Sequence, residues 1–269
     1  MNNPGGKNVL ITGGSSGIGY ELSKLFARDG YNLILVARSK QRLQEIRREL
    51  EHDFAVSVKV ISMDLSDPEQ PIRLYEILCR ENIAVHILVN NAGFGLLGDF
   101  RNTPLQRELE LLRVNEMAPL ILTKLFLPGM LERGEGRILN VASTAAFVPG
   151  PRMAVYYASK AHILSMSEAL ASELKDTGIT VTVLCPGPTR TGFQKTAGQK
   201  GANVLKFSVM EADRVAGDGY RGLMRGKKVV LPGILNKTSA FFARYAPHVL
   251  TLPVLKYLHK INRNNEQDE

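Results

Sequence analysis

The sequence of 269 residues contains only two cysteines, Cys79 and Cys185. That is too few for a disulfide framework or a cysteine-rich metal site, and Cys185 ends an apolar run in which a packing role is expected. No apolar run approaches the ~18 residues that a membrane-spanning helix needs. The first residues lack the apolar core of a secretory signal. These absences predict a reduced, cytoplasmic protein without a metal site.

Internal repeats and low-complexity stretches are also absent, and no composition shift marks a domain boundary. A chain of this length with 44% hydrophobic residues can bury the core of one α/β domain. Continuous apolar runs, typical of buried parallel strands, alternate with helical patterns. We predict a single domain over residues 1–269, with a doubly wound, seven-stranded parallel sheet and helices on both faces. The predicted strands cover 8–11, 32–37, 57–62, 86–90, 137–142, 180–185 and 228–231, and the predicted helices cover 17–29, 39–52, 68–82, 104–132 and 155–176.

A glycine-rich turn follows the first predicted strand and leads into an amphipathic helix. Its candidate contact residues are Gly13, Ser15, Ser16, Gly17, Ile18 and Gly19. Glycines let a backbone approach phosphates closely, and a helix N-terminus offers free N–H groups and a positive dipole end. The spacing Gly-x-x-x-Gly-x-Gly is one residue longer at its front than the usual dinucleotide fingerprint. The turn therefore predicts a pyrophosphate site.

Tyr156 stands four residues before Lys160 and thirteen residues after Ser143. Residues four apart share a helix face, where an ammonium lowers the pKa of a phenol below its usual ~10. Such a tyrosine can exchange a proton with a carbonyl or alcohol oxygen, which Ser143 could polarise from the end of its strand. The pair alone is weak evidence, because surface helices often carry this spacing by chance.

In their order and spacing these motifs resemble those of the short-chain dehydrogenase/reductase family. They are the turn from Thr12-Gly13, Asn90-Asn91-Ala92-Gly93, Asn115, Ser143, Tyr156-x-x-x-Lys160 and Pro186-Gly187. The similarity runs from about residue 7 to about 195, and the length fits the shorter, non-extended branch. The tail is similar to that of a ketoacyl-reductase-like or cell-wall-esterification-like oxidoreductase group. The resemblance implies a Rossmann fold, hydride transfer between a nicotinamide and a carbonyl or alcohol, and the catalytic residues Asn115, Ser143, Tyr156 and Lys160.

The end of the second strand bears on the choice of cofactor. An acidic residue there accepts the ribose hydroxyls of NAD. Here the sequence is Ala37-Arg38-Ser39, and an arginine can bind a 2′-phosphate through two parallel hydrogen bonds. We therefore expect NADP, although Arg38 could simply be a surface residue that opens a helix.

The resemblance places further residues around the cofactor. It implies that Asp64 and Leu65 lie beside the adenine, that Asn91, Ala92 and Gly93 approach the ribose, and that Lys160 also holds the ribose. The turn after the sixth strand would enclose the nicotinamide end through Pro186, Gly187, Thr189 and Thr191. Asn115 precedes Pro119 in a helical pattern that lacks one backbone donor, so its carbonyl could hold a water that connects Lys160 to solvent. An ordinary buried polar residue is the alternative for Asn115.

The substrate-binding residues are harder to predict from the sequence than the catalytic and cofactor-binding residues. Residues 192–220 are expected to form a lid of mixed composition that includes Phe193. Ser143, Ala145 and Tyr156 should contact the substrate, and further walls are expected from Phe94, Leu96, Leu97, Phe147 and Val148. This lining favours an apolar carbonyl compound, such as a long-chain aldehyde, a 3-oxoacyl thioester or a steroid-like ketone, over a sugar.

The C-terminal extension, about 236–261, belongs to a strongly basic end of the chain. Residues 221–269 hold nine Lys or Arg against three Asp or Glu, which is +6 of the net charge of +8. The extension could pack on its own domain or on a neighbouring subunit of a homo-oligomer, or it could contact a membrane surface or an acidic carrier. No nucleic-acid recognition motif accompanies the charge.

We therefore predict an NADP-dependent oxidoreductase acting on a small carbonyl or alcohol substrate, with Tyr156 as general acid and base. Two alternatives stay open. One is an NAD-linked dehydrogenase of hydroxy compounds, and the other is a nucleotide-sensing protein that has kept the site without turnover.

Overall fold

The computed structural model describes residues 6–192 and 209–245. Its centre is a parallel sheet of seven strands in the order β3-β2-β1-β4-β5-β6-β9. The strands are β1 (Asn8–Thr12), β2 (Asn32–Ala37), β3 (Val58–Ser62), β4 (Ile87–Asn90), β5 (Gly136–Val141), β6 (Ile179–Leu184) and β9 (Val229–Val230). The chain order reverses between β1 and β4, so the loops that follow these strands leave the sheet side by side. In open α/β sheets, ligands bind at this crevice.

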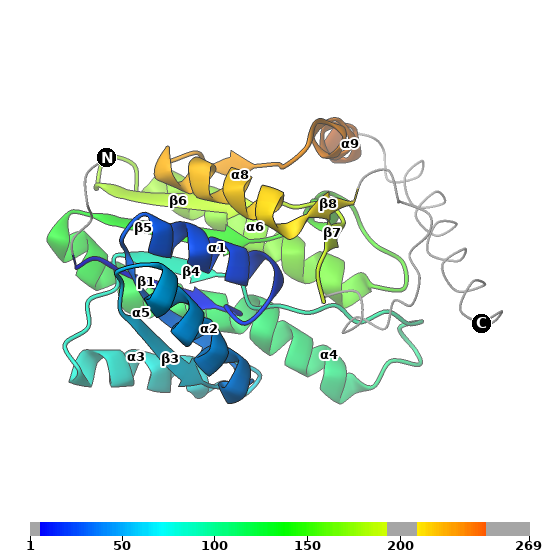
Figure 1. Cartoon of the computed structure of the whole chain (residues 1–269). Helices are drawn as coiled ribbons and strands as arrows, with labels where there is room; N and C mark the ends of the chain where they lie inside the picture. Colours follow the sequence, from blue (N-terminus) through cyan, green and yellow to red (C-terminus); the bar gives the residue numbers. More distant parts are fainter. Residues whose placement is uncertain (1–5, 193–208, 246–269) are drawn as a thin grey trace.

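Helices cover both faces of the sheet (Figure 1). Along β1, Val9 and Ile11 point to one face and Leu10 points to the other, and all three are fully buried. The first face packs against α1 (Gly17–Arg28), α2 (Lys40–Asp53) and α8 (Ala212–Met224). The second packs against α3 (Gln70–Arg80), α5 (Ala118–Arg133) and α6 (Ala154–Glu173). The near-continuous apolar strands follow from burial on both faces.

The predicted sheet is confirmed: all seven strands are present, and their ends lie within one residue of the predicted ones. The single helix predicted over 104–132 is instead α4 (Leu105–Leu112), a π-helical turn (Arg113–Met117) and α5. In the described ranges, no helix is long and apolar enough to span a bilayer.

The predicted lid is partly wrong. Residues 212–220 belong to α8, whose Val215, Ala216 and Tyr220 are buried against α1 and the sheet. Three apolar side chains at helical spacing were therefore core positions and not lid positions. Residues 193–208 lie outside the described ranges, so the rest of the lid stays a prediction.

The chain after β9 forms α9 (Ile234–Tyr245), at the end of the molecule where a short second sheet also lies (Figure 1). That sheet consists of β7 (Thr189–Arg190) and β8 (Met210–Glu211). α9 is the start of the predicted C-terminal extension. The rest of the extension, 246–261, lies outside the described ranges.

Candidate active site

The glycine-rich turn folds tightly between β1 and α1. Gly13 donates to the carbonyl of Val36 over 2.8 Å and has a φ of +67°, a conformation that suits glycine. A Cβ on Gly19 would lie 2.3 Å from the carbonyl oxygen of Gly13. The first turn of α1 carries no acidic side chain, so its free N–H groups face no competing anion of their own helix. The turn fits a pyrophosphate, as the sequence predicts.

Exchange of Gly19 for alanine is expected to destabilise this turn by about 1–3 kcal/mol and to weaken dinucleotide binding, because the new methyl group meets rigid backbone. Gly14→Ala is the matched control: its Cβ would meet the flexible Leu35 side chain at 3.2 Å, and the nearest backbone atom, the Ile11 oxygen, would lie 3.6 Å away. Thermal unfolding and cofactor titration of both variants test this. Equal behaviour of the two variants would contradict the assigned role of Gly19.

Thr12 holds the two central loops together, a role that sequence analysis missed. Its hydroxyl accepts hydrogen bonds from the backbone N–H groups of Asn91 (3.0 Å) and Ala92 (3.1 Å). The Asn91 amide donates in return to the carbonyls of Thr12 and Gly13. The predicted contact residues Asn91 and Ala92 are therefore fixed beside the glycine-rich turn. The signal in the sequence that could have indicated this role is a threonine hydroxyl at the end of the first strand.

The residues predicted to bind the adenosine end lie at the ends of β2 and β3. Arg38 is exposed. The Ser39 hydroxyl accepts from the N–H of Arg42 and caps α2, a structural role beside the predicted one. Asp64 accepts from the N–H of Ser66, and Leu65 is buried. The geometry leaves the Arg38 guanidinium available to an anion in solvent.

Ser143 and Tyr156 meet at the end of β5. Ser143 follows that strand, and its hydroxyl accepts from the N–H of Ala145 and donates to the carbonyl of Pro186. Tyr156 lies in the first turn of α6, is 8% exposed, and forms a hydrogen bond with Ser143. The structure thus brings together two of the predicted catalytic residues around one point at the sheet edge.

Lys160 lies one helical turn further along α6 and is buried. Its ammonium donates to the carbonyl of Val141 over 3.1 Å and lies 5.8 Å from the centre of the Tyr156 ring. Burial lowers the pKa of Lys160 to about 8, so the group is still mostly protonated at neutral pH.

The expected lowering of the Tyr156 pKa is wrong for this structure. Burial raises the pKa of the phenol well above its ordinary value, and the hydrogen bond with Ser143 lowers it only in part. The ammonium bonds to Val141 instead of to the phenol, and desolvation of the phenolate dominates. Tyr156 is therefore held in the protonated form that a proton donor requires.

Asn115 lies in the π-helical turn, where the predicted disturbance of the helix is confirmed. Its side chain is 1% exposed, donates to the Phe94 carbonyl and to Ser159, and accepts from the N–H of Phe94. A Cβ on Gly93 would lie 3.1 Å from the Asn115 oxygen and 3.3 Å from the Lys160 nitrogen. Gly93 thus lets Asn115 and Lys160 approach the same point, and the relay water remains a prediction.

The turn after β6 closes over the dinucleotide loop. A Cβ on Gly17 would lie 2.9 Å from the Thr191 methyl group, so Thr191 packs directly against the glycine-rich turn. The Thr189 hydroxyl donates to the carbonyl of Gly187, and Pro186 accepts from Ser143 and from the N–H of Thr144. These contacts unite the Pro186–Thr191 turn with both predicted sites.

The extension contributes to this turn, which the sequence did not indicate. Asn236 of α9 is 6% exposed and donates to the Pro232 carbonyl. A Cβ on Gly187 would lie 2.4 Å from the Asn236 amide oxygen. α9 therefore packs directly on the turn after β6, so the first part of the extension packs on its own domain, one of the expected arrangements.

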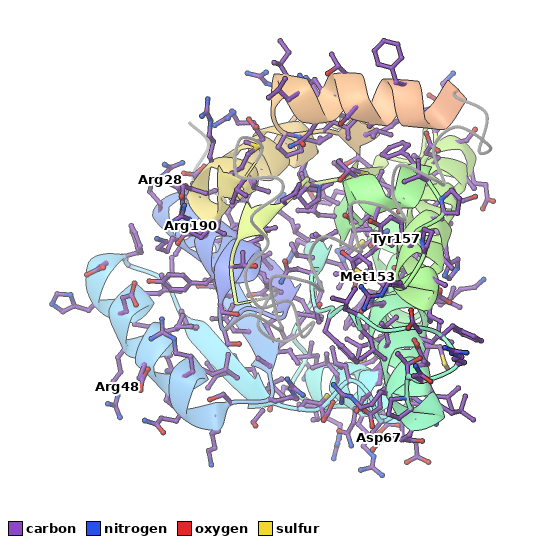
Figure 2. The ribbon with its side chains drawn as sticks, turned by 90° about the vertical axis from the view of Figure 1, so that its right-hand side faces the viewer. Arg28, Arg48, Asp67, Met153, Tyr157 and Arg190 are labelled. Carbon is purple, nitrogen blue, oxygen red and sulfur yellow. The ribbon has the colours of Figure 1, made fainter. Side chains whose placement is uncertain are left out.

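An apolar cluster surrounds Tyr156. Ala145, Leu111 and Met153 pack with the phenol ring, and Phe94, Leu96, Leu97, Val155 and Tyr157 join them from partly buried positions. Met153 and Tyr157 lie at the start of α6, on the side facing the middle of the molecule, with β7 and its Arg190 across from them (Figure 2). Ala145 lies beside Tyr156, whereas Phe193 lies outside the described residues; both substrate contacts stay predictions. No group of three His, Cys, Asp or Glu side chains in the described ranges could hold a metal ion.

Fold and site together define an α/β nucleotide-binding protein with a largely buried Ser-Tyr-Lys group beside its dinucleotide turn. The family described as "short chain dehydrogenase" matches residues 7–202. The chain belongs to this oxidoreductase family and is similar to its ketoacyl reductases.

Several relatives support this placement. The chain is 37% identical over 184 residues to "Very-long-chain 3-oxoacyl-CoA reductase" of Pyrenophora tritici-repentis, which covers 66% of this chain and 53% of the relative. It thus spans about half the length of that relative. It is 30% identical over 249 residues to "Dehydrogenase/reductase SDR family member 7B" of Danio rerio, covering 88% and 81% of the two chains. It is also 33% identical over 216 residues to "Ketoacyl reductase HetN" of Nostoc sp., covering 77% and 75%.

Solved structures share the fold. A short-chain dehydrogenase from Sphingobium yanoikuyae in complex with NADPH has a TM-score of 0.80 at 34% identity and covers 87% of this chain and 92% of its own. A "bulky-bulky ketone specific alcohol dehydrogenase" from Comamonas testosteroni has a TM-score of 0.76 at 32% identity, with coverage of 88% and 92%.

Proposed function

We propose that the protein is an NADP(H)-dependent oxidoreductase that interconverts an apolar carbonyl compound and its alcohol. The main supporting observation is the group formed by buried Tyr156, Lys160 and Asn115 and partly buried Ser143, which lies beside the glycine-rich turn and an apolar cluster. Gly13, Gly17 and Gly19 let the turn pack tightly against itself and its neighbouring loops, because a Cβ at any of them would come within 3 Å of protein atoms. Such a tight, glycine-dependent turn is the kind that binds a dinucleotide pyrophosphate. A bound nicotinamide supplies or accepts the hydride at the substrate carbon.

The side chains handle the oxygen of the substrate. Tyr156, protonated because it is buried, donates its proton to the oxygen during reduction and takes it back during oxidation. Ser143 orients the same oxygen, because its hydroxyl is fixed between Ala145 and Pro186. The Lys160 ammonium places a positive charge behind the phenol, and Asn115 links that charge to solvent through the proposed water.

The substrate proposal rests on the cluster around Tyr156 and on the relatives. Phe94, Leu96 and Leu97 offer apolar surface to a substrate and no fixed anion site. One relative is described as a reductase of very-long-chain 3-oxoacyl-CoA, and one structural neighbour as specific for bulky ketones. A 3-oxoacyl thioester or another bulky apolar ketone is therefore proposed ahead of a sugar.

The preference for NADP(H) over NAD(H) is proposed to depend on Arg38. A guanidinium–phosphate pair contributes about 1.5–3 kcal/mol, or roughly tenfold to a hundredfold in affinity. The double change Ala37→Asp with Arg38→Ile should reverse the ratio of the two dissociation constants, measured by fluorescence titration. Equal affinities of the unmodified protein for both cofactors would contradict this proposal.

A substrate screen tests the proposed function as a whole. The purified protein is mixed separately with NADPH and with NADH, and loss of absorbance is followed with 3-oxoacyl thioesters, bulky ketones, long-chain aldehydes and sugars. We expect turnover with apolar carbonyls and NADPH. Turnover with NADH alone would favour the NAD-linked alternative, and tight cofactor binding without turnover would favour the nucleotide-sensing one.

Assembly and cellular placement are part of the same proposal. We propose a cytoplasmic homo-oligomer that acts on small molecules and binds no nucleic acid. The exposed Ile234 (77%) and Leu235 (60%) of α9 support a contact of the extension with a second subunit or a membrane surface.

A further inference from the structure

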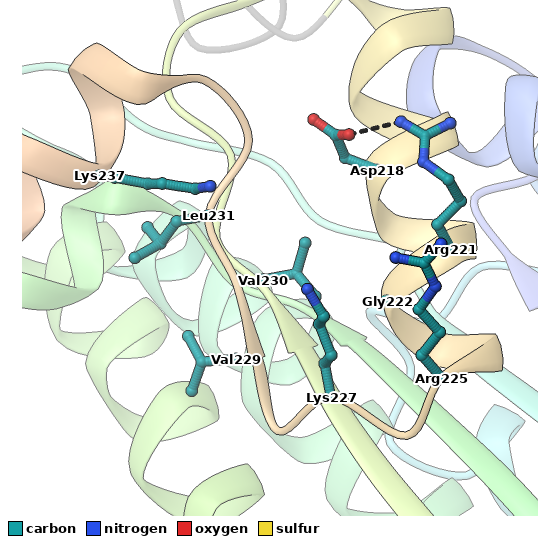
Figure 3. Close-up of a pocket in the computed structure, with 9 residues that line it drawn as sticks. All are labelled: Asp218, Arg221, Gly222, Arg225, Lys227, Val229, Val230, Leu231 and Lys237. Carbon is teal, nitrogen blue, oxygen red and sulfur yellow. Dashed lines mark hydrogen bonds and ion pairs between the residues drawn. The ribbon is translucent and has the colours of Figure 1, made fainter.

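A basic cavity of about 220 Å³ lies at the β9 edge of the sheet, between α8 and α9. Figure 3 shows Arg221, Arg225 and Lys227 on the side of α8 and its following turn, with Lys237 pointing toward them from α9. None of its lining residues belongs to the glycine-rich turn or to the group around Tyr156. The cavity is therefore separate from the proposed catalytic centre.

The lining has a strong excess of positive charge. Four cationic side chains, Arg221, Arg225, Lys227 and Lys237, face one carboxylate, that of Asp218. Asp218 is paired with Arg221 at 2.6 Å, as the dashed line in Figure 3 marks. Within residues 6–192 and 209–245, the other three cations form no ion pair. Like charges at close range raise the local potential and favour a bound anion.

The backbone around the cavity is well ordered by its own hydrogen bonds. Arg225 donates to the carbonyl of Arg221 over 3.2 Å, and Lys227 donates to the carbonyl of Gly222 over 2.9 Å. Gly226, with a φ of +64°, makes the sharp turn between them. The fold thus fixes the backbone positions from which the side chains of Arg221, Arg225 and Lys227 extend, at the end of α8 and in the turn that follows it.

The floor of the cavity is apolar and close-packed. A Cβ on Gly222 would lie 2.2 Å from a methyl group of Val230, so the absence of a side chain there lets α8 lie against β9. Val229 and Leu231 continue this floor toward α9. A concave surface with an apolar floor and a cationic rim is suited to a compact anion attached to a less polar body.

We infer that this cavity binds a phosphate group. Guanidinium groups bind phosphate oxygens through paired N–H donors, and lysine ammonium groups add point charges. Arg225 would supply the planar donor, with Lys227 and Lys237 on either side of the anion. The inference is independent of the proposed oxidoreductase function, because it rests on none of the same side chains.

Calorimetric titration of the whole protein with pyrophosphate, in the presence of saturating NADP, tests the site, because the cofactor then occupies the pyrophosphate site of the glycine-rich turn. Arg225→Gln combined with Lys227→Gln should weaken binding roughly tenfold to a hundredfold, because two charged donors are lost. Lys237→Gln alone, on a different element, should weaken it less, which gives a second test should the double variant not fold.

Two matched controls test whether pyrophosphate binds in this cavity and not elsewhere on the protein. Lys228→Gln removes an equal charge next to Lys227 but outside the cavity lining, and Arg38→Gln alters the proposed NADP site. Both should keep the pyrophosphate affinity within about twofold, since neither side chain lines the cavity. No binding by the unmodified protein, an equal loss in Lys228→Gln, or complete loss in Arg38→Gln would overturn the inference.

The source of the phosphate is distinguished by flotation with vesicles. Phosphatidylcholine vesicles are compared with phosphatidylcholine–phosphatidic acid vesicles, for the unmodified protein and for Arg225→Gln/Lys227→Gln. Flotation with the acidic vesicles that the double change abolishes would identify a lipid headgroup. Pyrophosphate binding without flotation would identify a soluble phosphate compound.

Discussion

Replacement of Tyr156 by phenylalanine is expected to lower turnover by roughly a thousandfold or more, because the ring still packs but no proton can be transferred. The affinity for NADPH should change little, since the lost hydroxyl lies at the substrate oxygen. Steady-state rates and cofactor titration on the same preparation separate the two effects.

Tyr157→Phe is the matched control for this change. Tyr157 is the next residue of α6, and its ring packs where a Cβ on Gly150 would come within 2.3 Å. Loss of its hydroxyl should leave turnover within a few-fold of the unmodified protein. If Tyr157→Phe were the more damaging substitution, Tyr156 would not be the proton donor.

Replacement of Lys160 by methionine is expected to reduce both turnover and NADPH affinity, each by roughly a hundredfold. The first effect follows from loss of the charge behind Tyr156, and the second from loss of the proposed ribose donor. Methionine keeps an unbranched side chain of similar length, so the packing of α6 against β5 should survive. Rate and dissociation constant are measured together.

The same substitution should lower turnover and NADPH affinity but should not lower the free energy of unfolding. Burial lowers the Lys160 pKa from 10.5 to about 8, so between these pH values the folded protein binds fewer protons than the unfolded one. The free energy of unfolding of the cofactor-free protein should therefore rise with pH across this window, by an amount on the order of 3 kcal/mol. Lys160→Met should lack this rise and be at least as stable near neutral pH. If Lys160→Met were inactive because it does not fold, the expected stability would be contradicted and Lys160 would have a structural role instead of the assigned chemical one.

The sequence was sufficient to predict the sheet, because a strand that is buried on both faces consists of consecutive apolar residues. Strands such as β1 and β2 contain continuous apolar runs bounded by polar or glycine residues, and their ends agree with prediction within one residue. The glycine-rich turn could also be predicted from the sequence, since the backbone of Gly13 comes so close to position 19 that only glycine fits there.

What the sequence did not predict depends on tertiary contacts. The spacing of Tyr156 and Lys160 places them on one helix face, but only the structure shows that the ammonium bonds to Val141 and that desolvation raises the phenol pKa. The core role of α8 was hidden because Val215 and Tyr220 pack against α1, which lies almost two hundred residues earlier in the chain. Asn236 offered no motif, and its place against Gly187 follows from the fold alone.

Transfer of deuterium from the cofactor to the substrate carbon tests the proposed hydride transfer most directly. The protein is incubated with an apolar ketone from the screen and with NADPH deuterated at nicotinamide C4, using each of the two stereoisomers in turn. We predict that one isomer yields an alcohol one mass unit heavier, with the deuterium on the carbinol carbon, and that Tyr156→Phe yields none above background. Absence of alcohol across the whole ketone panel, or an alcohol without deuterium from either isomer, would contradict the proposed reaction.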